Sequence, residues 1–276
     1  MFESRIDLPM MLPTRIVEKV WGRESLPAPF RAPEGARVGE IWFEPPPAMS
    51  QLLVKYLFTS DKLSVQCHPD AAQAREAGLG ETGKDECWVV IAAEPGASLG
   101  IGFDRHLDPK AMREAARDGS IEHLMQWYEV QAGDVFYIPA NTVHAIGSGC
   151  SIIEVQQNTD ITYRLYDYGR PRELHLEAGM AVADGSPYDT SLHQRLPDSG
   201  SATLVDGPFF RLDWVDGVPD DGLLYTYAEP LLVLPLAGEV LVSGSEVVKP
   251  GECALAPDLA SVTFAPQGKA LVTAPC

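Results

Sequence analysis

The chain has 276 residues, 45% of them hydrophobic and 22% charged, which is typical of a globular protein with one large or two modest domains. Its 39 acidic and 21 basic residues give a formal net charge of −18. That charge disfavours nucleic acid and anionic membrane surfaces as partners. No apolar run approaches the roughly 20 residues that a membrane-spanning helix needs.

Two features of the sequence indicate a cytoplasmic protein. The N-terminal stretch MFESRIDLPMMLPTR has no basic segment followed by an apolar one, so we do not expect a secretory signal. The cysteines form an odd set with no CxxC pair, which is unlike a disulfide framework. They are Cys67, Cys87, Cys150, Cys253 and Cys276.

Along the chain, Pro and Gly separate short apolar runs that predict β-strands. In the first part these runs are QLLVKYLF (51–58), KLSVQCH (62–68), CWVVIAA (87–93), VFYIPA (135–140) and SIIEVQQ (151–157). A short helix is expected over 70–76 and a helical segment over 108–127, in which Asp108 caps, Pro109 starts and Gly119 ends the first helix. Later strands are expected in FFRLDWV (209–215), PLLVLPLAGEVLVS (230–243) and ECALAP (252–257).

This pattern predicts a mainly β protein with two related jelly-roll barrels in tandem. The polar stretch 184–202, rich in Ser, Pro and Asp, is the expected linker. It separates a first domain, 1–183, from a second, 203–276, in which a "PGE" turn parallels the "AGD" turn of the first. No histidine follows His193, so we expect the chemistry in the first domain and a degenerate second one.

Polar side chains share one face of several strands that are otherwise apolar. Ser64, Gln66 and His68 alternate with apolar residues, and successive side chains of a strand point to opposite faces. With Glu86 and His144 from other strands, Gln66 and His68 would offer two imidazoles, a carboxylate and an amide oxygen, a donor set that suits Zn²⁺. The alternative is that these histidines are ordinary core residues with satisfied hydrogen bonds. Spacing alone leaves both interpretations open.

Basic residues flank the same strands in a chain that is poor in them. Lys84 and Arg164 border strongly apolar runs, where an unpaired charge is costly, so a surface ion pair explains them poorly. For Lys62 an ordinary surface pair is the preferred interpretation. Lys55 and Arg170 lie near the same runs.

Four ordered stretches resemble one known family. KLSVQCHPD, GKDECWVVI, GDVFYIPANTVHAIGSG and IIEVQQNTDITYRLYDYGR resemble the type I mannose-6-phosphate isomerases, particularly their short bacterial form. VEKVWGRE, VGEIWFE and LLVKYLFTSDK look like N-terminal segments of that family, in the same order. The resemblance runs from about residue 15 to 170, with looser similarity onward through a degenerate second cupin domain.

The resemblance implies tandem cupin barrels and one zinc ion per chain, bound by Gln66, His68, Glu86 and His144. It implies that Ser64 is a hydroxyl at the substrate phosphate and that Lys55 approaches the phosphate end. Arg170 stands where longer members carry a lysine, but the local sequence YDYGR departs from theirs. The helical domain of longer members is here reduced to the segment 108–127.

The resemblance also implies catalytic roles for Lys84, Glu154 and Arg164. Lys84 corresponds to the lysine two positions before the glutamate ligand, Glu154 to a carboxylate proposed as acid or base, and Arg164 to the active-site arginine. Asp85 should point away from the site, by strand alternation. Cys67 and Cys87 should lie on the strand face opposite the ligands and serve as core residues.

The implied activity is a zinc-dependent interconversion of mannose 6-phosphate and fructose 6-phosphate, an aldose–ketose isomerisation through a cis-enediol. The implied partner is therefore a small sugar phosphate. Two alternatives remain: a sugar-phosphate-binding homologue without turnover, and a metal-dependent cupin oxygenase, since fold alone does not determine function. Oligomeric state does not follow from composition.

Overall fold

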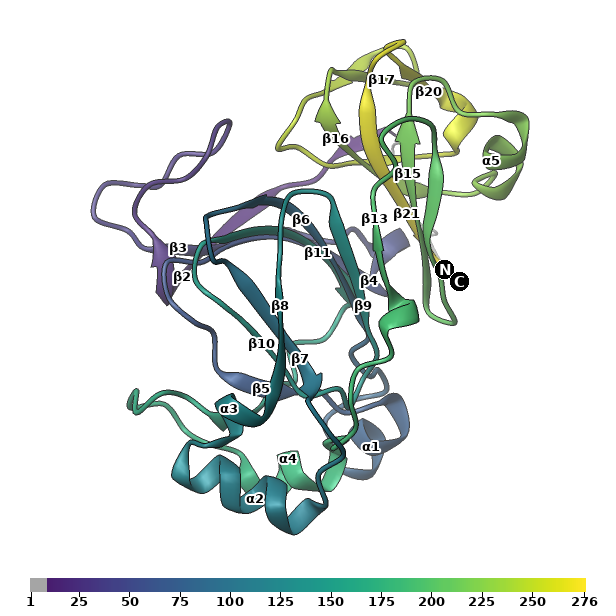
Figure 1. Ribbon diagram of the computed structural model, residues 1–276. Coiled ribbons are helices and arrows are strands. Elements are labelled where there is room, and N and C mark those ends of the chain that lie inside the picture. The colour runs from purple at the N-terminus through teal and green to yellow at the C-terminus, as the bar shows by residue number, and fades with distance from the viewer. Residues whose placement is uncertain (1–8) are drawn as a thin grey trace.

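The computed structural model describes residues 9–276. This part of the chain contains four antiparallel sheets. Residues 1–8 lie outside this description, so the structure does not bear on the expectation that the N-terminal stretch lacks a secretory signal. The sheets pair into two β units, a larger one followed by a smaller one (Figure 1). This arrangement confirms the predicted mainly β, tandem-barrel fold.

The first barrel consists of a seven-stranded and a five-stranded sheet. The larger sheet has the order β13-β9-β6-β11-β4-β3-β2 and the smaller has the order β12-β5-β10-β7-β8. The larger sheet comprises β2 (Thr14–Arg23), β3 (Val38–Phe43), β4 (Leu52–Phe58), β6 (Glu86–Ala93), β9 (Asp134–Ile138), β11 (Cys150–Gln157) and β13 (His193–Arg195). The smaller sheet comprises β5 (Val65–Cys67), β7 (Ser98–Phe103), β8 (Met125–Glu129), β10 (His144–Ile146) and β12 (Tyr163–Tyr166).

The second barrel consists of a six-stranded sheet, β1-β19-β16-β21-β15-β14, and a three-stranded one, β18-β17-β20. Its strands are β1 (Met10–Met11), β14 (Ala202–Asp206), β15 (Phe210–Asp216), β16 (Leu231–Ala237), β17 (Val240–Val242), β18 (Glu246–Val248), β19 (Ala254–Ala256), β20 (Val262–Phe264) and β21 (Lys269–Pro275). β1 pairs with β19, so the start of the described chain completes the C-terminal sheet.

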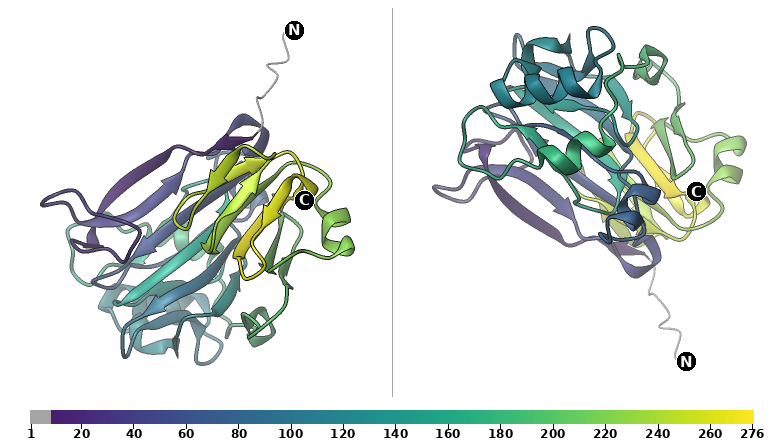
Figure 2. Two further views of the ribbon diagram at one scale, coloured as in Figure 1. Left: turned by 90° about the horizontal axis from the view of Figure 1, so that it is seen from above. Right: turned by 90° about the horizontal axis from the view of Figure 1, so that it is seen from below.

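Most of the helices gather at the end of the first barrel that lies away from the second (Figures 1 and 2). They are α1 (Ala71–Glu76), α2 (Pro109–Asp118), α3 (Ile121–Leu124) and α4 (Leu176–Val182), whereas α5 (Asp221–Thr226) belongs to the second barrel. Short 3-10 turns form η1 (Pro47–Met49), η2 (Thr190–Leu192) and η3 (Leu259–Ser261). None of the described helices is both long and apolar enough to cross a membrane.

The expected helical segment has the predicted caps but ends earlier. The Asp108 side chain accepts hydrogen bonds from the backbone N–H groups of Lys110 and Ala111, and Gly119 ends α2 in the left-handed conformation with φ 84°. A glycine adopts this conformation without steric cost. The helical part stops at Leu124, because Met125 already pairs with β7 as the first residue of β8.

The stretch 184–202, predicted as a linker, is bonded to the first barrel. Within it, β13 extends the seven-stranded sheet by pairing with β9, in the register His193 to Phe136. The imidazole of His193 stacks on the ring of Phe136 with centroids 4.1 Å apart. The predicted domain boundaries at 183 and 203 remain predictions, but the chain between them is not free of contacts.

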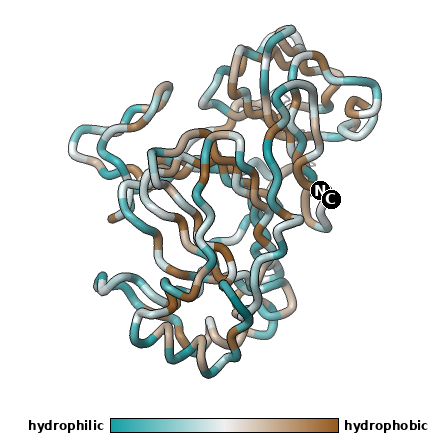
Figure 3. Tube along the Cα trace, in the orientation of Figure 1, coloured by the Kyte–Doolittle hydropathy of each residue, from teal (hydrophilic) through white to brown (hydrophobic). Residues whose placement is uncertain are grey.

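A shared hydrophobic core joins the two barrels. Figure 3 shows hydrophobic stretches following the strands of both units. One buried cluster contains Val54, Phe58 and Ile153 from the first barrel together with Phe210 and Leu255 from the second. The central strands β4, β6 and β11 are therefore covered on both faces: one face packs toward the second barrel and the other faces the interior of the first.

Alternation along these strands separates apolar from polar side chains. On β11, Ile153 and Val155 belong to the shared core, whereas Glu154 between them lines a cavity inside the first barrel. On β6, Cys87 belongs to the shared core, and Glu86 before it lines that cavity. The five cysteines are free thiols, four of them buried.

Truncating Phe210 tests whether the shared core makes the two barrels one folding unit. Phe210 is fully buried, so Phe210→Ala should lower the free energy of unfolding by about 3–5 kcal/mol. Thermal unfolding followed by calorimetry should show one transition at a lower temperature, as expected for a single cooperative unit. Val218→Ala, at a site that is 74% exposed, is the matched control and should leave the melting temperature nearly unchanged. A second transition that alone responds to Phe210→Ala would show that the barrels unfold separately.

Candidate active site

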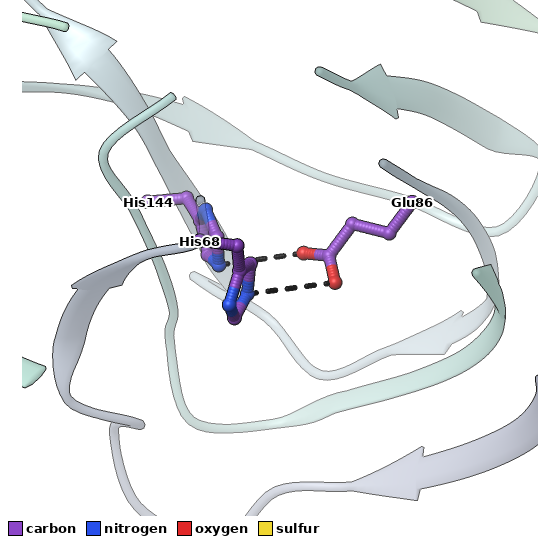
Figure 4. A group of neighbouring side chains, drawn as sticks. All are labelled: His68, Glu86 and His144. Atoms are coloured by element: carbon purple, nitrogen blue, oxygen red, sulfur yellow. Dashed lines mark ion pairs between the residues drawn. The ribbon is translucent and has the colours of Figure 1, made fainter. Parts of the chain in front are cut away.

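Three of the predicted ligands meet inside the first barrel (Figure 4). His68 follows β5, Glu86 opens β6 and His144 opens β10. The Nε2 atoms of His68 and His144 lie 3.7 and 3.3 Å from the two carboxylate oxygens of Glu86. All three residues are 1% exposed. Their candidate ligand atoms lie within 4.8 Å of one another, close enough to converge on a single metal ion.

Backbone carbonyl groups fix the orientation of both imidazoles. Nδ1 of His68 lies 2.8 Å from the carbonyl oxygen of Ile161, and Nδ1 of His144 lies 2.9 Å from that of Thr142. A carbonyl oxygen only accepts hydrogen bonds, so each Nδ1 must carry the proton. Each Nε2 then carries a lone pair and lies toward Glu86, which is the arrangement found for metal-binding histidines.

Gln66 lies beside this cluster on the adjacent strand. It is the register partner of His144 in the β5–β10 pair, and its Nε2 lies 3.3 Å from Nε2 of His144. The hydroxyl of Ser64 donates to its Oε1 across 3.1 Å. The amide group therefore lies beside the cluster. A half-turn about its terminal bond would place Oε1, instead of Nε2, toward the histidine and carboxylate ligand atoms.

Both imidazoles are neutral at pH 7. Burial lowers the pKa of His144 to about 4, with a further lowering by the nearby Lys84 charge. Burial and Lys84 also hold the pKa of His68 well below its usual value. A histidine must be neutral to bind a metal ion, so the environment keeps both residues in the binding form.

The donor set fits a zinc ion. Two oriented imidazole nitrogens and one carboxylate, all buried, together with the amide oxygen of the half-buried Gln66, match the ligand types that zinc accepts. The Lys84 ammonium lies 2.8 Å from Oε2 of Glu86 and 3.2 Å from Nε2 of His68. The carboxylate is thus already paired with a cation on one side.

A chain of buried ion pairs runs from this cluster across the larger sheet. Lys84 Nζ lies 3.7 Å from Oε1 of Glu154, and Lys55 Nζ lies 3.0 Å from the same oxygen. Burial disfavours a charge on Lys55, yet Glu154 and Glu40 outweigh it and raise its pKa. Lys55 therefore remains a cation although it is 7% exposed.

The surroundings of Glu154 favour the protonated form of its carboxyl group. Burial raises its pKa, the charge of Glu86 adds to the effect, and Lys55 and Lys84 oppose it. A carboxylate with a raised pKa accepts a proton more readily than an exposed one. The environment thus suits Glu154 to accept and return a proton.

The ion pairs border a cavity of about 420 Å³, a volume typical of small-molecule binding sites. Its walls carry six basic and four acidic residues, in a chain where acids outnumber bases almost two to one. The basic residues are Arg15, Lys19, Lys55, Lys84, Arg164 and Arg172, and the acidic ones are Glu40, Glu86, Glu154 and Asp160. The cavity is therefore a local excess of positive charge within an acidic protein.

Most of the predicted site residues line this cavity. Ser64 and Arg164 do, and Arg164 is the register partner of Gln66 across β5 and β12. Arg170 is not among the lining residues: its guanidinium binds Asp167 at 2.9 Å and the carbonyl oxygen of Lys62 at 2.7 Å. Its predicted contact with a substrate phosphate therefore stays a prediction.

Lys62 and Asp85, which we expected to lie outside the site, do so. The ammonium of Lys62 pairs with Glu122, outside the cavity lining. Asp85 points away from the cavity, accepting hydrogen bonds from the Tyr137 hydroxyl at 2.5 Å and from the Ala140 amide at 3.1 Å.

The sequence analysis missed a wall of the cavity that β2 and β3 provide. Lys19 and Trp21 on β2, and Glu40 and Trp42 on β3, are lining residues. Each pair has a spacing of two, which places both members on one strand face. That alternation in VEKVWG and GEIWF was the available signal. Asp160 and Arg172, which follow no such period because they lie outside the strands, were missed as well.

Acid should destabilise the metal-free protein through His144. Its pKa is about 4 in the folded chain and near 6.5 in the unfolded one, so the unfolded state binds the proton first. Stability should therefore fall as the pH drops from about 6.5 to about 4, by about 3 kcal/mol from this residue. Urea unfolding across this pH range checks it, with His144→Gln as the control that lacks the titrating group. Parallel pH dependences for both proteins would contradict the prediction.

Comparisons with known proteins show which proteins the chain is similar to. No family model matches the chain. A mannose-6-phosphate isomerase of Streptococcus mutans serotype c is 40% identical over 197 residues, which are 68% of this chain and 61% of that protein. The match thus spans less than two thirds of the relative's length.

Solved structures share the fold along nearly the whole chain. The mannose 6-phosphate isomerase from Bacillus subtilis superposes with a TM-score of 0.79 at 24% identity, covering 96% of this chain and 99% of that one. A zinc-bound mannose 6-phosphate isomerase gives a TM-score of 0.75 at 13% identity, covering 97% and 99%. The sequence match and the shared fold together show that the chain belongs to the type I mannose-6-phosphate isomerase family.

Proposed function

We propose that the protein interconverts mannose 6-phosphate and fructose 6-phosphate, as a zinc-dependent aldose–ketose isomerase. The observation that carries the proposal is the cluster of His68, Glu86 and His144 at a cavity that also contains the Lys84–Glu154 pair. An enediol isomerisation needs a base that takes a proton from carbon and a positive charge that stabilises the oxygen. Glu154 and a metal ion bound by the cluster would provide these two groups on one cavity wall. The similarity to the Streptococcus mutans relative supports the same activity.

The charge of the cavity suits an anionic substrate. A phosphate dianion approaching a protein of net charge −18 meets an unfavourable field, which the basic lining residues offset locally. Ser64 and Lys55, with their predicted roles toward the phosphate, lie on this lining. Lys55 is held by Glu154 and Glu40, so its charge also stabilises these carboxylates.

In the open-chain sugar, the isomerisation moves one proton between C2 and C1. We assign the base to Glu154, whose carboxylate takes the C2 proton while the O1 carbonyl gains a proton and becomes a hydroxyl of the cis-enediol. Loss of the O2 proton and return of a proton to C1 complete the ketose. Lys84 and Arg164 are assigned to the negative charge that develops on the sugar oxygens. Such electrostatic stabilisation is often the largest contribution to catalysis.

The metal cluster is assigned one zinc ion per chain. His68, Glu86, His144 and Gln66 would hold it, and bound zinc would supply a fixed positive charge that orients sugar hydroxyls and stabilises anionic oxygen. Lys84 lies within 2.8 Å of Glu86, so it couples this cluster to the proposed base Glu154. The cytoplasmic location stays a prediction from the sequence.

Removal of zinc should abolish the activity reversibly. A coupled assay converting mannose 6-phosphate to fructose 6-phosphate should lose its signal after chelation and recover it when one equivalent of zinc is added. Metal content measured alongside should follow the activity. Absence of turnover in metal-replete protein would favour the binding homologue, and oxygen consumption would favour the oxygenase.

Replacing the proposed base tests the mechanism. Glu154→Gln keeps the shape of the side chain but removes its basicity, so kcat should fall about 10²–10⁴-fold. Exchange of the C2 proton with solvent, followed by NMR in deuterated water, should stop as well. Zinc content equal to wild type is the required control, because Glu154 lies one lysine away from the cluster. Exchange at a near wild-type rate would assign the base to another residue.

A further inference from the structure

Three arginines lie near the carboxylate of Asp167: Arg164 on β12, and Arg170 and Arg172 in the segment that follows. Asp167 is 2% exposed and accepts from Nε and Nη2 of Arg172, both at 2.6 Å. The same carboxylate accepts from Nη2 of Arg170 at 2.9 Å. Arg164 binds the segment through Nη1, which donates to the carbonyl oxygen of Glu173 at 2.7 Å. The buried Asp167 thus forms ion pairs with two of the three neighbouring guanidinium groups.

Arg170 is committed away from the cavity. Besides Asp167, it donates to the carbonyl oxygen of Lys62 at 2.7 Å, and its Nη1 lies 3.7 Å from Asp61. Its guanidinium carbon lies 5.3 Å from the ring centroid of Tyr168. These contacts hold the side chain in the structure of the segment.

Arg172 faces the other way and lines the cavity with Arg164. The two-bond contact with Asp167 uses Nε and Nη2 and sets the plane of the guanidinium. Nη1, with two N–H donors, is the nitrogen left for another acceptor. A guanidinium held in this way is preorganised for an oxyanion, since little side-chain entropy remains to be lost.

The charges around this part of the cavity leave a positive excess. Lys19, Lys55 and Lys84 form ion pairs with glutamates of the lining. Among residues 9–276, Arg164 has no ion pair with a carboxylate, and its buried Nε has no hydrogen-bond partner. Burial and the nearby Arg172 charge lower the pKa of Arg164, and the charge of Asp167 opposes this lowering only in part.

We propose that Arg172, rather than Arg170, binds the substrate phosphate together with Arg164, and thereby selects phosphorylated over free sugars. The inference rests on the proposed sugar-phosphate substrate and deepens it by naming the residue that recognises the phosphate. Arg170 then has a supporting role, which is to hold Asp167 and the segment in place.

Inorganic phosphate is the probe that tests this site without turnover. Titration calorimetry should show that Arg172→Ala weakens phosphate binding to the zinc-loaded protein about 10- to 100-fold, the loss expected for charge-assisted hydrogen bonds. Arg172→Lys keeps the positive charge but lacks the paired N–H donors of the guanidinium group, so it should bind phosphate more tightly than Arg172→Ala and less tightly than wild type. Arg170→Ala should weaken binding less than threefold. Arg113→Ala, which removes a surface partner of Glu177, is the matched arginine control.

Steady-state kinetics provide the second measurement. For Arg172→Ala, KM for mannose 6-phosphate and the inhibition constant of phosphate should rise together, while kcat changes less than about threefold. Thermal melts and zinc content identify any variant that fails to fold. Unchanged phosphate affinity in folded Arg172→Ala, or an equal loss in Arg170→Ala, would overturn the proposal. Phosphate binding that depends on Arg172 without isomerase turnover would instead reject the proposed activity and retain the anion site.

Discussion

Two lysines and two glutamates, buried on neighbouring strands or just before one, impose the constraint on which the site depends. Lys55, Glu154, Lys84 and Glu86 form one chain of ion pairs with distances of 3.0, 3.7 and 2.8 Å. Charges with so little access to water are tolerated only when each has a close partner, and removing one partner leaves an expensive unpaired charge. The geometry of the cavity floor is therefore strongly restrained.

The restraint is supplied by strands that cannot shift. β4, β6 and β11 are adjacent in the larger sheet and pack against the second barrel through side chains such as Phe58 and Ile153. A slip of one residue would turn the apolar face inward and the charges outward. The second barrel, which has no histidine, thus serves the site by covering the back of the strands that carry it.

The two ends of the cavity have different physical character. At the metal cluster, orientation is achieved with backbone carbonyls that hold the protons on Nδ1 of His68 and His144. At the arginine segment, one buried carboxylate, Asp167, orders cations that would otherwise repel one another. The first arrangement favours a bound cation and the second favours a bound anion. The proposed sugar phosphate would require both, with its sugar near the metal ion and its phosphate near the arginines.

The sequence by itself determined the fold class, whereas the residues of the candidate metal cluster were indicated by the resemblance to a known family and not by spacing alone. Period-two patterns with turn residues predict the strands, and Gln66, His68, Glu86 and His144 each lie on or next to a strand whose alternation orients the side chain. The same alternation places Asp85 away from the site. These features are local, so they can be derived from neighbouring residues.

Only the tertiary structure decided which charges face the cavity and which are already neutralised. Arg170 and Arg172 are two positions apart and both bind Asp167, yet Arg170 also contacts Asp61 and a carbonyl group outside the cavity while Arg172 lines it. The linker prediction failed to foresee β13 for a related reason, because strand pairing with β9 depends on a segment about 60 residues away. Irregular segments have no period, and the direction of their side chains is set by contacts between residues that are distant in the sequence.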